Sequence, residues 1–213
     1  MQITHLGHSA VLVETAGIRV LLDPGNLSDA WHGLAGLDAI VVTHQHPDHI
    51  DPANVPAVVA ANPGARILVE PSVVQQVQLD RAEPLAADAR VTIGGLTISA
   101  VGGLHAVIHR DIPRIGNVGL VLSAEGEPTL FHPGDSLEAI PAGIDVVAVP
   151  LHGPWAAMKE HIDFLRAVAA PSGFPIHDGL LNERGWQLAF TRYNEMAPSK
   201  LVDQRDRRAW TPA

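Results

Sequence analysis

The chain has 213 residues, 46% of them hydrophobic and 17% charged, which suits one folded domain with a sizeable core and excludes a disordered chain. The formal net charge of −9 argues against a general nucleic-acid-binding protein, which needs a basic surface to displace counterions from phosphates. The absence of cysteine excludes disulfides, thiolate metal ligands and cysteine nucleophiles.

Runs of Val, Ile and Leu bounded by Gly, Pro, Asp and Asn predict β-strands along most of the chain. The predicted strands cover residues 3–7, 10–15, 19–22, 39–43, 66–69, 90–93, 96–101, 118–123, 129–132, 146–150 and 173–176. Gly94-Gly95 lies between two of these runs and predicts a two-residue hairpin turn.

Helical periodicity is confined to four segments, 51–62, 71–79, 155–169 and 183–196. The third has the clearest apolar stripe, which runs from Trp155 to Val168 at three- and four-residue steps. His161 falls off that stripe, so we expect it to face solvent, as we do for His32. The polar tail after Ser199 is expected to lie on the surface or to fray.

No targeting or membrane segment is predicted. The start of the chain lacks the basic residues and the continuous apolar run of a signal peptide. The apolar stretches elsewhere have the length of strands, far below the roughly 20 residues of a membrane helix. We therefore expect a cytoplasmic protein.

The segment most informative about function is Val41-Val42-Thr43-His44-Gln45-His46-Pro47-Asp48-His49. A buried strand leads into a short loop with the pattern H-x-H-x-D-H. Imidazole nitrogens and carboxylate oxygens suit Zn²⁺, Mn²⁺ or Fe²⁺, and a loop at a strand end can point neighbouring side chains at one spot. A polar turn that binds nothing would not need four ligand-type residues in six positions.

Here the sequence resembles the metallo-β-lactamase-fold hydrolases, whose central signature is this H-x-H-x-D-H. The resemblance is closest to the small branch related to ascorbate-6-phosphate lactonase. Further matching segments follow in the family's order: Thr4-His5-Leu6-Gly7-His8-Ser9-Ala10, Leu21-Leu22-Asp23-Pro24, Gly102-Gly103-Leu104-His105-Ala106, Phe131-His132-Pro133-Gly134-Asp135-Ser136 and Phe174-Pro175-Ile176-His177-Asp178-Gly179.

The resemblance implies a four-layer αββα sandwich, with two mixed β-sheets covered by helices, in a single domain over residues 1–213. It also implies a site for two divalent metal ions, most often zinc, with manganese or iron as alternatives. One metal would be held by His44, His46 and His105 and the other by Asp48, His49 and His177, with Asp135 bridging the two. Of the metal ligands, Asp48 and Asp135 are also the expected catalytic residues.

Four further residues are candidates for the surroundings of the site. In the family the residue matching Asp23 orients ligands by hydrogen bonding, although Asp23 could also bind directly or cap the turn before Pro24. His8, His132 and His152 either line the substrate pocket or are ordinary packing or surface histidines. The same choice holds for His5 and His109.

The resemblance implies hydrolysis of an ester-like bond in a small molecule, a lactone, phosphodiester or thioester, by a hydroxide held between the metals. Asp48 could also relay a proton to the leaving group. The alternatives are an iron-dependent oxidoreductase or dioxygenase on the same scaffold, a metal-binding module without turnover, and a phosphodiesterase acting on nucleotides. No nucleic-acid or membrane partner is expected, and assembly into a homo-oligomer is expected because relatives assemble.

Overall fold

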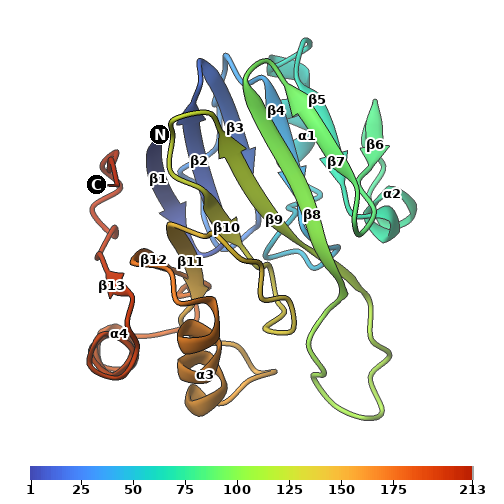
Figure 1. Ribbon diagram of the computed structural model, residues 1–213. Helices are drawn as coiled ribbons and strands as arrows, with labels where there is room; N and C mark the ends of the chain where they lie inside the picture. The colour runs from blue at the N-terminus through green and yellow to red at the C-terminus, as the bar shows by residue number, and fades with distance from the viewer. Residues whose placement is uncertain (213) are drawn as a thin grey trace.

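Two mixed β-sheets form the centre of the computed structural model, which describes residues 1–212 (Figure 1). The first sheet contains, in spatial order, β1 (Gln2–Gly7), β2 (Ala10–Thr15), β3 (Ile18–Leu22), β4 (Ala39–Val42), β5 (Arg66–Val69) and β6 (Ala82–Pro84). The second contains β13 (Lys200–Leu201), β12 (Ser172–Ile176), β11 (Val146–Pro150), β10 (Leu130–His132), β9 (Gly116–Ala124), β8 (Leu96–Leu104) and β7 (Arg90–Ile93).

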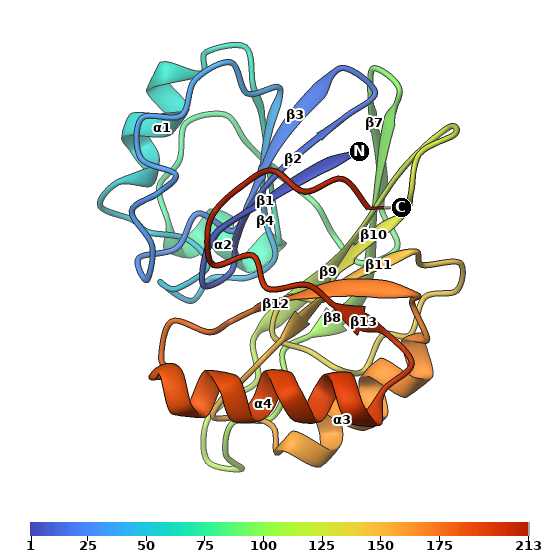
Figure 2. The ribbon, with the colours of Figure 1, turned by 90° about the vertical axis from the view of Figure 1, so that its left-hand side faces the viewer.

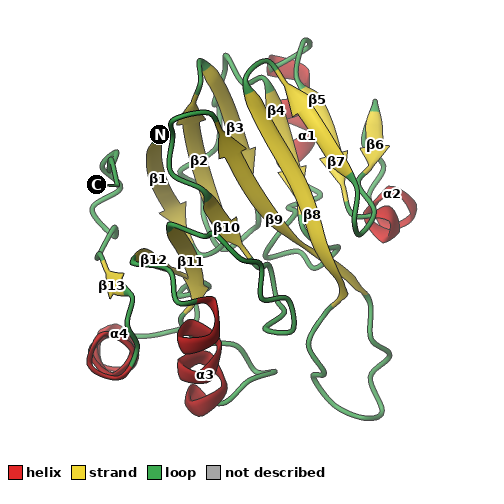
Figure 3. Cartoon of the chain, in the orientation of Figure 1, coloured by secondary structure: helices red, strands yellow, loops and turns green. Residues whose placement is uncertain are grey.

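Helices cover the outer face of each sheet (Figures 2 and 3). α1 (Val55–Ala61) and α2 (Pro71–Gln76) lie against the first sheet, and α3 (Met158–Val168) and α4 (Glu183–Met196) against the second. The layer order is therefore helix, sheet, sheet, helix, and the predicted αββα sandwich is confirmed.

Alternation along the strands explains how one chain fills three apolar layers, because successive side chains of a strand point to opposite faces. In β4, Val41 packs in the core between the two sheets, whereas Ile40 and Val42 pack on the α1 side. In the second sheet, Phe174 of β12 lies in the same inner core, and Val147 of β11 packs against α3 and α4.

The strand directions bring several strand ends to one edge of the sandwich. β3 and β4 run parallel, as do β10, β11 and β12. β8 shares the direction of β10, because both pair antiparallel with β9. The loops that follow β4, β8, β10 and β12 carry the residues singled out in the sequence, and all four leave the sheets at this edge.

The segment after Ser199 lies largely on the surface, as expected, but it is held by the fold and does not fray. β13 extends the second sheet, and the following segment crosses to the first sheet beside β1 (Figure 2). There Trp210 and Ile3 exchange two backbone hydrogen bonds of 2.8 Å, and the Trp210 ring packs on the inner core. Within residues 1–212, no helix is long and apolar enough to cross a membrane.

Two expectations for the third helix are wrong. α3 begins at Met158, so Trp155 precedes the helix and lies in a loop. His161 is buried rather than solvent-facing, with 1% of its surface exposed, because α4 covers this side of α3. Its ring stacks on Tyr193 of α4 at 5.8 Å between centroids, and Nδ1 lies 3.1 Å from the Ala157 carbonyl. His32 is exposed, as predicted.

Candidate metal centre

The first group of candidate ligands comes from three strand ends. His44 and His46 follow β4, His105 follows β8, and Asp135 follows β10. The potential ligand atoms of these four residues all lie within 4.8 Å of one another. His44, His105 and Asp135 are buried and His46 is partly exposed, so a metal ion here would be reached from the His46 side.

The second group lies beside the first. Asp48 and His49 come from the same loop as His44, His177 follows β12, and His8 follows β1; the potential ligand atoms again lie within 4.8 Å of one another. The structure thus brings together all seven residues predicted as ligands, divided as predicted, and adds His8 to the second group.

Asp135 lies between the two groups. Its Oδ2 is 3.4 Å from His105 Nε2 and 4.0 Å from His44 Nε2, both of the first group. The same oxygen is 3.1 Å from His177 Nε2, and Oδ1 is 3.0 Å from His49 Nε2. One carboxylate therefore contacts rings of both groups, which is the position that a bridging ligand requires.

Hydrogen bonds on the outer side of the rings assign their tautomers. Nδ1 of His105 lies 2.7 Å from the Ala106 carbonyl, and Nδ1 of His177 lies 2.5 Å from the His152 carbonyl. A carbonyl can only accept, so in both rings Nδ1 carries a proton, and Nε2 is the atom directed at the other candidate ligands. This is the arrangement that metal-bound histidines use, with the second nitrogen held by an oxygen.

Asp23 supplies the same support to the H-x-H-x-D-H loop. It is fully buried at the end of β3, and its Oδ2 accepts from His49 Nδ1 at 2.6 Å and from the Thr43 hydroxyl at 2.7 Å. Its Oδ1 accepts from the Thr43 backbone N–H at 2.8 Å. Asp23 is therefore not a member of either group of candidate ligands. It holds the candidate ligand His49 by a hydrogen bond, and it fixes the loop through Thr43.

His8 donates to a ligand. The backbone N–H of Gly179 donates to His8 Nδ1 at 3.0 Å, which leaves the proton on Nε2. Nε2 in turn donates to Asp48 Oδ2 at 3.1 Å. Although His8 lies within reach of the second group, this tautomer makes it a hydrogen-bond donor that orients Asp48.

His132 and His152 lie further from the ligand atoms. His132 is buried, and its Nε2 donates to the Ser9 carbonyl at 3.1 Å while Nδ1 accepts from the Gly134 N–H at 3.2 Å. The side chain of His152 is exposed, and only its carbonyl takes part, as the acceptor for His177. His5 Nε2 donates to the His8 carbonyl at 2.8 Å, and His109 is exposed in the loop after β8.

The charges of the cluster stabilise one another. Burial would raise the pKa of the Asp135 carboxyl, but His49 and His177 outweigh it and hold that pKa well below its usual range. Burial would lower the pKa of His177, but Asp135 and Asp48 raise it to about 9. Burial lowers the pKa of His44 well below its usual value. The anionic carboxylates and the neutral His44 ring are the forms in which these side chains bind metals.

Unsatisfied polar atoms show that a cation fits this donor set. His105 Nε2, His177 Nε2 and Asp135 Oδ1 are buried and have no hydrogen-bond partner among the described residues. Buried polar atoms without partners are rare in folded proteins and call for an explanation. Metal ions coordinated by these atoms would supply it, and a set of imidazoles and carboxylates without thiolates suits Zn²⁺, Mn²⁺ or Fe²⁺.

Four residues that shape the site were not predicted as site residues from the sequence. Thr43 links Asp23 to the rings, and the Ser9 hydroxyl lies 3.2 Å from His49 Nε2. Asn117 of β9 holds the loop before Asp135, accepting from the Asp135 N–H at 2.9 Å and donating to the Pro133 carbonyl at 3.0 Å. The indole N–H of Trp155 donates to Asp135 itself. Such contacts join distant segments, so no spacing in the sequence reveals them.

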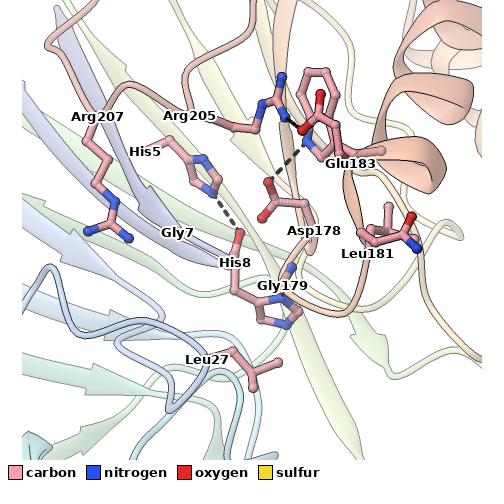
Figure 4. A pocket seen from close by; sticks show the side chains of 12 residues that line it. His5, Gly7, His8, Leu27, Asp178, Gly179, Leu181, Glu183, Arg205 and Arg207 are labelled. Atoms are coloured by element: carbon pink, nitrogen blue, oxygen red, sulfur yellow. Dashed lines mark hydrogen bonds and ion pairs between the residues drawn. The ribbon is translucent and has the colours of Figure 1, made fainter.

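A polar pocket of about 230 Å³ is lined by His8 but not by its partner Asp48 (Figure 4). The segment after β12 and the end of the chain form its other walls. The Arg205 guanidinium lies 3.5 Å above the Trp186 ring and pairs with Glu183 at 2.6 Å, while Asp178 accepts from the Trp186 indole at 3.2 Å. Two of its charged groups, Arg205 and Glu183, are thus paired with each other.

A sandwich of two mixed sheets, with H-x-H-x-D-H and three further ligand loops at one edge, defines a protein of the metallo-β-lactamase fold. Residues 2–177 match the family described as Beta-lactamase superfamily domain, and the chain belongs to that family. This confirms the resemblance inferred from the motifs.

Individual proteins agree with this assignment. Protein Rv0786c of Mycobacterium tuberculosis is 40% identical over 200 residues, which are 92% of each chain. A UPF0173 metal-dependent hydrolase of Rhizobium meliloti is 34% identical over 151 residues, covering 64% of this chain and 63% of that protein. Among solved structures, the metallo-beta-lactamase fold protein YhfI of Bacillus subtilis has a TM-score of 0.74 at 15% identity, over 98% of both chains.

Proposed function

We propose that this member of the metallo-β-lactamase superfamily is a metal-dependent hydrolase that cleaves an ester-like bond in a small molecule. Its site would hold two divalent metal ions, with zinc favoured. His44, His46 and His105 would hold one ion, and Asp48, His49 and His177 the other. Asp135 would bind both. The bond cleaved would be that of a lactone, a thioester or a phosphodiester.

The observation that carries the proposal is the position of Asp135 between two complete groups of ligands. Its carboxylate lies within 3.4 Å of rings from each group, and its Oδ1 is buried without a hydrogen-bond partner. A carboxylate that only capped the turn at Gly134 would not need imidazole nitrogens on both sides.

A bound metal pair would lower the pKa of bound water towards about 7 and polarise the oxygen of the scissile group. The protein's part is to hold the donor atoms in place before the substrate arrives. Asp23 fixes His49, the backbone carbonyls fix His105 and His177, and His8 fixes Asp48.

The contacts of Asp48 favour ligation over proton transfer. Burial would raise its pKa, but the neighbouring His177 ring and the hydrogen bond from His8 outweigh burial and lower the pKa well below the ordinary range. A carboxylate held so firmly in its anionic form is a good metal ligand and a weak proton store. Its side chain is 25% exposed, so the substrate would approach from the side of Asp48 and His46.

Metal analysis followed by a substrate panel tests this proposal. We expect the purified protein to contain close to two transition-metal ions per chain and to hydrolyse one class among lactones, thioesters and phosphodiesters. Asp135→Asn is expected to lose most of that hydrolysis and part of the metal. The same ligands accept iron, so oxygen consumption is measured in parallel. A protein that binds no metal after reconstitution, or a fully active Asp135→Asn variant with two metals, would refute the proposal.

A further inference from the structure

The loop between β11 and α3 is built around the indole of Trp155. The side chain is 9% exposed, and an isolated backbone bridge joins Gly153 to Ala156 on either side of it. A Cβ atom on residue 153 would lie 2.5 Å from the Trp155 ring, closer than such contacts occur. Glycine at 153 is therefore what allows the indole to lie where it does.

This indole contacts both groups of candidate ligands. Its N–H donates to Asp135 Oδ2 at 2.8 Å, and both partners are buried. The ring lies edge to face against His105 of the first group and His177 of the second, with centroid distances of 6.1 and 6.0 Å. Trp155 thus contacts the shared carboxylate and one ring on each side of it.

The hydrogen bond from Trp155 makes the two carboxylate oxygens of Asp135 inequivalent. Oδ2, which accepts from Trp155, faces His105 and His177, while Oδ1 faces His49 and accepts no hydrogen bond. A hydrogen bond to an ionised carboxylate is short, directional and stronger than a neutral one. In this buried position it opposes rotation of the carboxylate about its Cβ–Cγ bond.

We propose that Trp155 is a positioning residue for the bridging carboxylate, holding Asp135 so that Oδ2 stays between His105 and His177 while Oδ1 stays directed at His49. The inference rests on the proposed two-metal site. It assigns Trp155 no contact with the substrate or the reacting atoms, and its effect passes through Asp135 alone.

Trp155→Phe is the decisive variant, because it keeps an aromatic ring in the loop while removing the N–H donor, and the same loss of ring volume occurs in the control. Trp186→Phe is the matched control: the Trp186 indole N–H also donates to a carboxylate, that of the partly exposed Asp178, but Trp186 lies outside both groups. Zn²⁺ affinity of metal-stripped protein is measured by competition with a chromogenic chelator. We expect Trp155→Phe to weaken binding about 10–100-fold and the control to change it by less than about twofold.

A double-mutant cycle separates positioning from packing. If Trp155 acts through Asp135, replacing it in an Asp135→Ala background should change the remaining Zn²⁺ affinity by less than about twofold. Additive losses in the double variant would overturn the proposal, as would unchanged affinity in Trp155→Phe alone. Asp135→Asn replaces Asp135→Ala in the cycle if the alanine variant does not fold.

An indole ¹⁵N–¹H spectrum of metal-free protein gives an independent readout. We expect the Trp155 signal, assigned by its loss in Trp155→Phe, to move when Asp135 is replaced while the Trp186 signal stays. An unmoved Trp155 signal would overturn the inference. Wild-type protein that binds no Zn²⁺ would refute the two-metal site itself, whereas tight binding by both wild type and Trp155→Phe would refute only the role of Trp155.

Discussion

At the scale of single residues, the metal centre depends on atoms that hold the ligands from outside. Asp23 is the clearest example, because its two oxygens accept three hydrogen bonds from Thr43 and His49. The sequence predicted its place beside the site from the family resemblance alone. The hydrogen bonds supply the physical reason.

Asp23→Asn should weaken metal binding without abolishing it. The amide replaces one acceptor oxygen by a donor, so His49 or Thr43 loses its partner, and such changes typically cost about 10–100-fold in affinity. Zn²⁺ competition titration measures the effect. Asp203→Asn, which removes an acidic group paired with Arg205 away from the ligands, serves as the control and should bind as wild type does. Equal loss in both variants would contradict the role of Asp23.

His161 should make the protein less stable in acid. Burial lowers its folded-state pKa to about 4, below the unfolded value of 6.5. Between pH 4 and 6.5 the unfolded chain binds a proton on His161 that the folded protein does not bind. The stability contributed by the neutral, buried His161 ring is therefore present above pH 6.5 and is lost as the pH falls towards 4. From pH 7 to 5 the loss amounts to about 2 kcal/mol.

Urea unfolding of the metal-free protein at both pH values tests this. His161→Leu should lose less stability than wild type between pH 7 and 5. Metal-free samples are used because metal release and protonation of the metal ligands would otherwise add to the pH dependence of the free energy of unfolding. If the two proteins showed the same pH dependence, His161 would not be titrating as its burial requires.

At the scale of elements, continuous apolar runs predicted the strands that bury both faces, and helical periodicity predicted Glu183–Met196 at its observed bounds. β6 and β13 were missed because they have three and two residues and are held by pairing with a neighbour rather than by their own pattern. α1 begins at Val55, later than predicted, because Asp51 accepts from Ala53 N–H and Asn54 and forms a turn instead.

The course of the last segment also depends on long-range contacts that no local pattern reveals. Trp210→Ala should destabilise the protein by about 1–3 kcal/mol, less than a fully buried tryptophan would, since the ring is only partly covered. Denaturant unfolding measures the change in the free energy of unfolding. The control variant Arg208→Ala, at an exposed position, should have a free energy of unfolding within about 0.5 kcal/mol of wild type. Equal stability of all three proteins would show that the segment is not anchored through Trp210.

At the scale of the whole molecule, the candidate metal ligands come from both sheets. His44 and Asp23 come from the first sheet, and His105, Asp135 and His177 from the second. Metals bound across this edge stabilise only the folded state, so their removal should lower the melting temperature. At a free metal concentration of about 100 times Kd, the stabilisation is about 2.7 kcal/mol. Calorimetry with and without chelator checks this, and identical melting temperatures would contradict it.

The central claim is that one carboxylate joins two separate metal sites. Anomalous scattering from crystals of the metal-loaded protein tests it most directly. We expect two peaks on either side of Asp135, with the peak beside His44 and His46 lost in His105→Ala and the peak beside Asp48 and His49 lost in His177→Ala. A single peak in the wild type, or loss of the same peak in both variants, would contradict the two-metal centre.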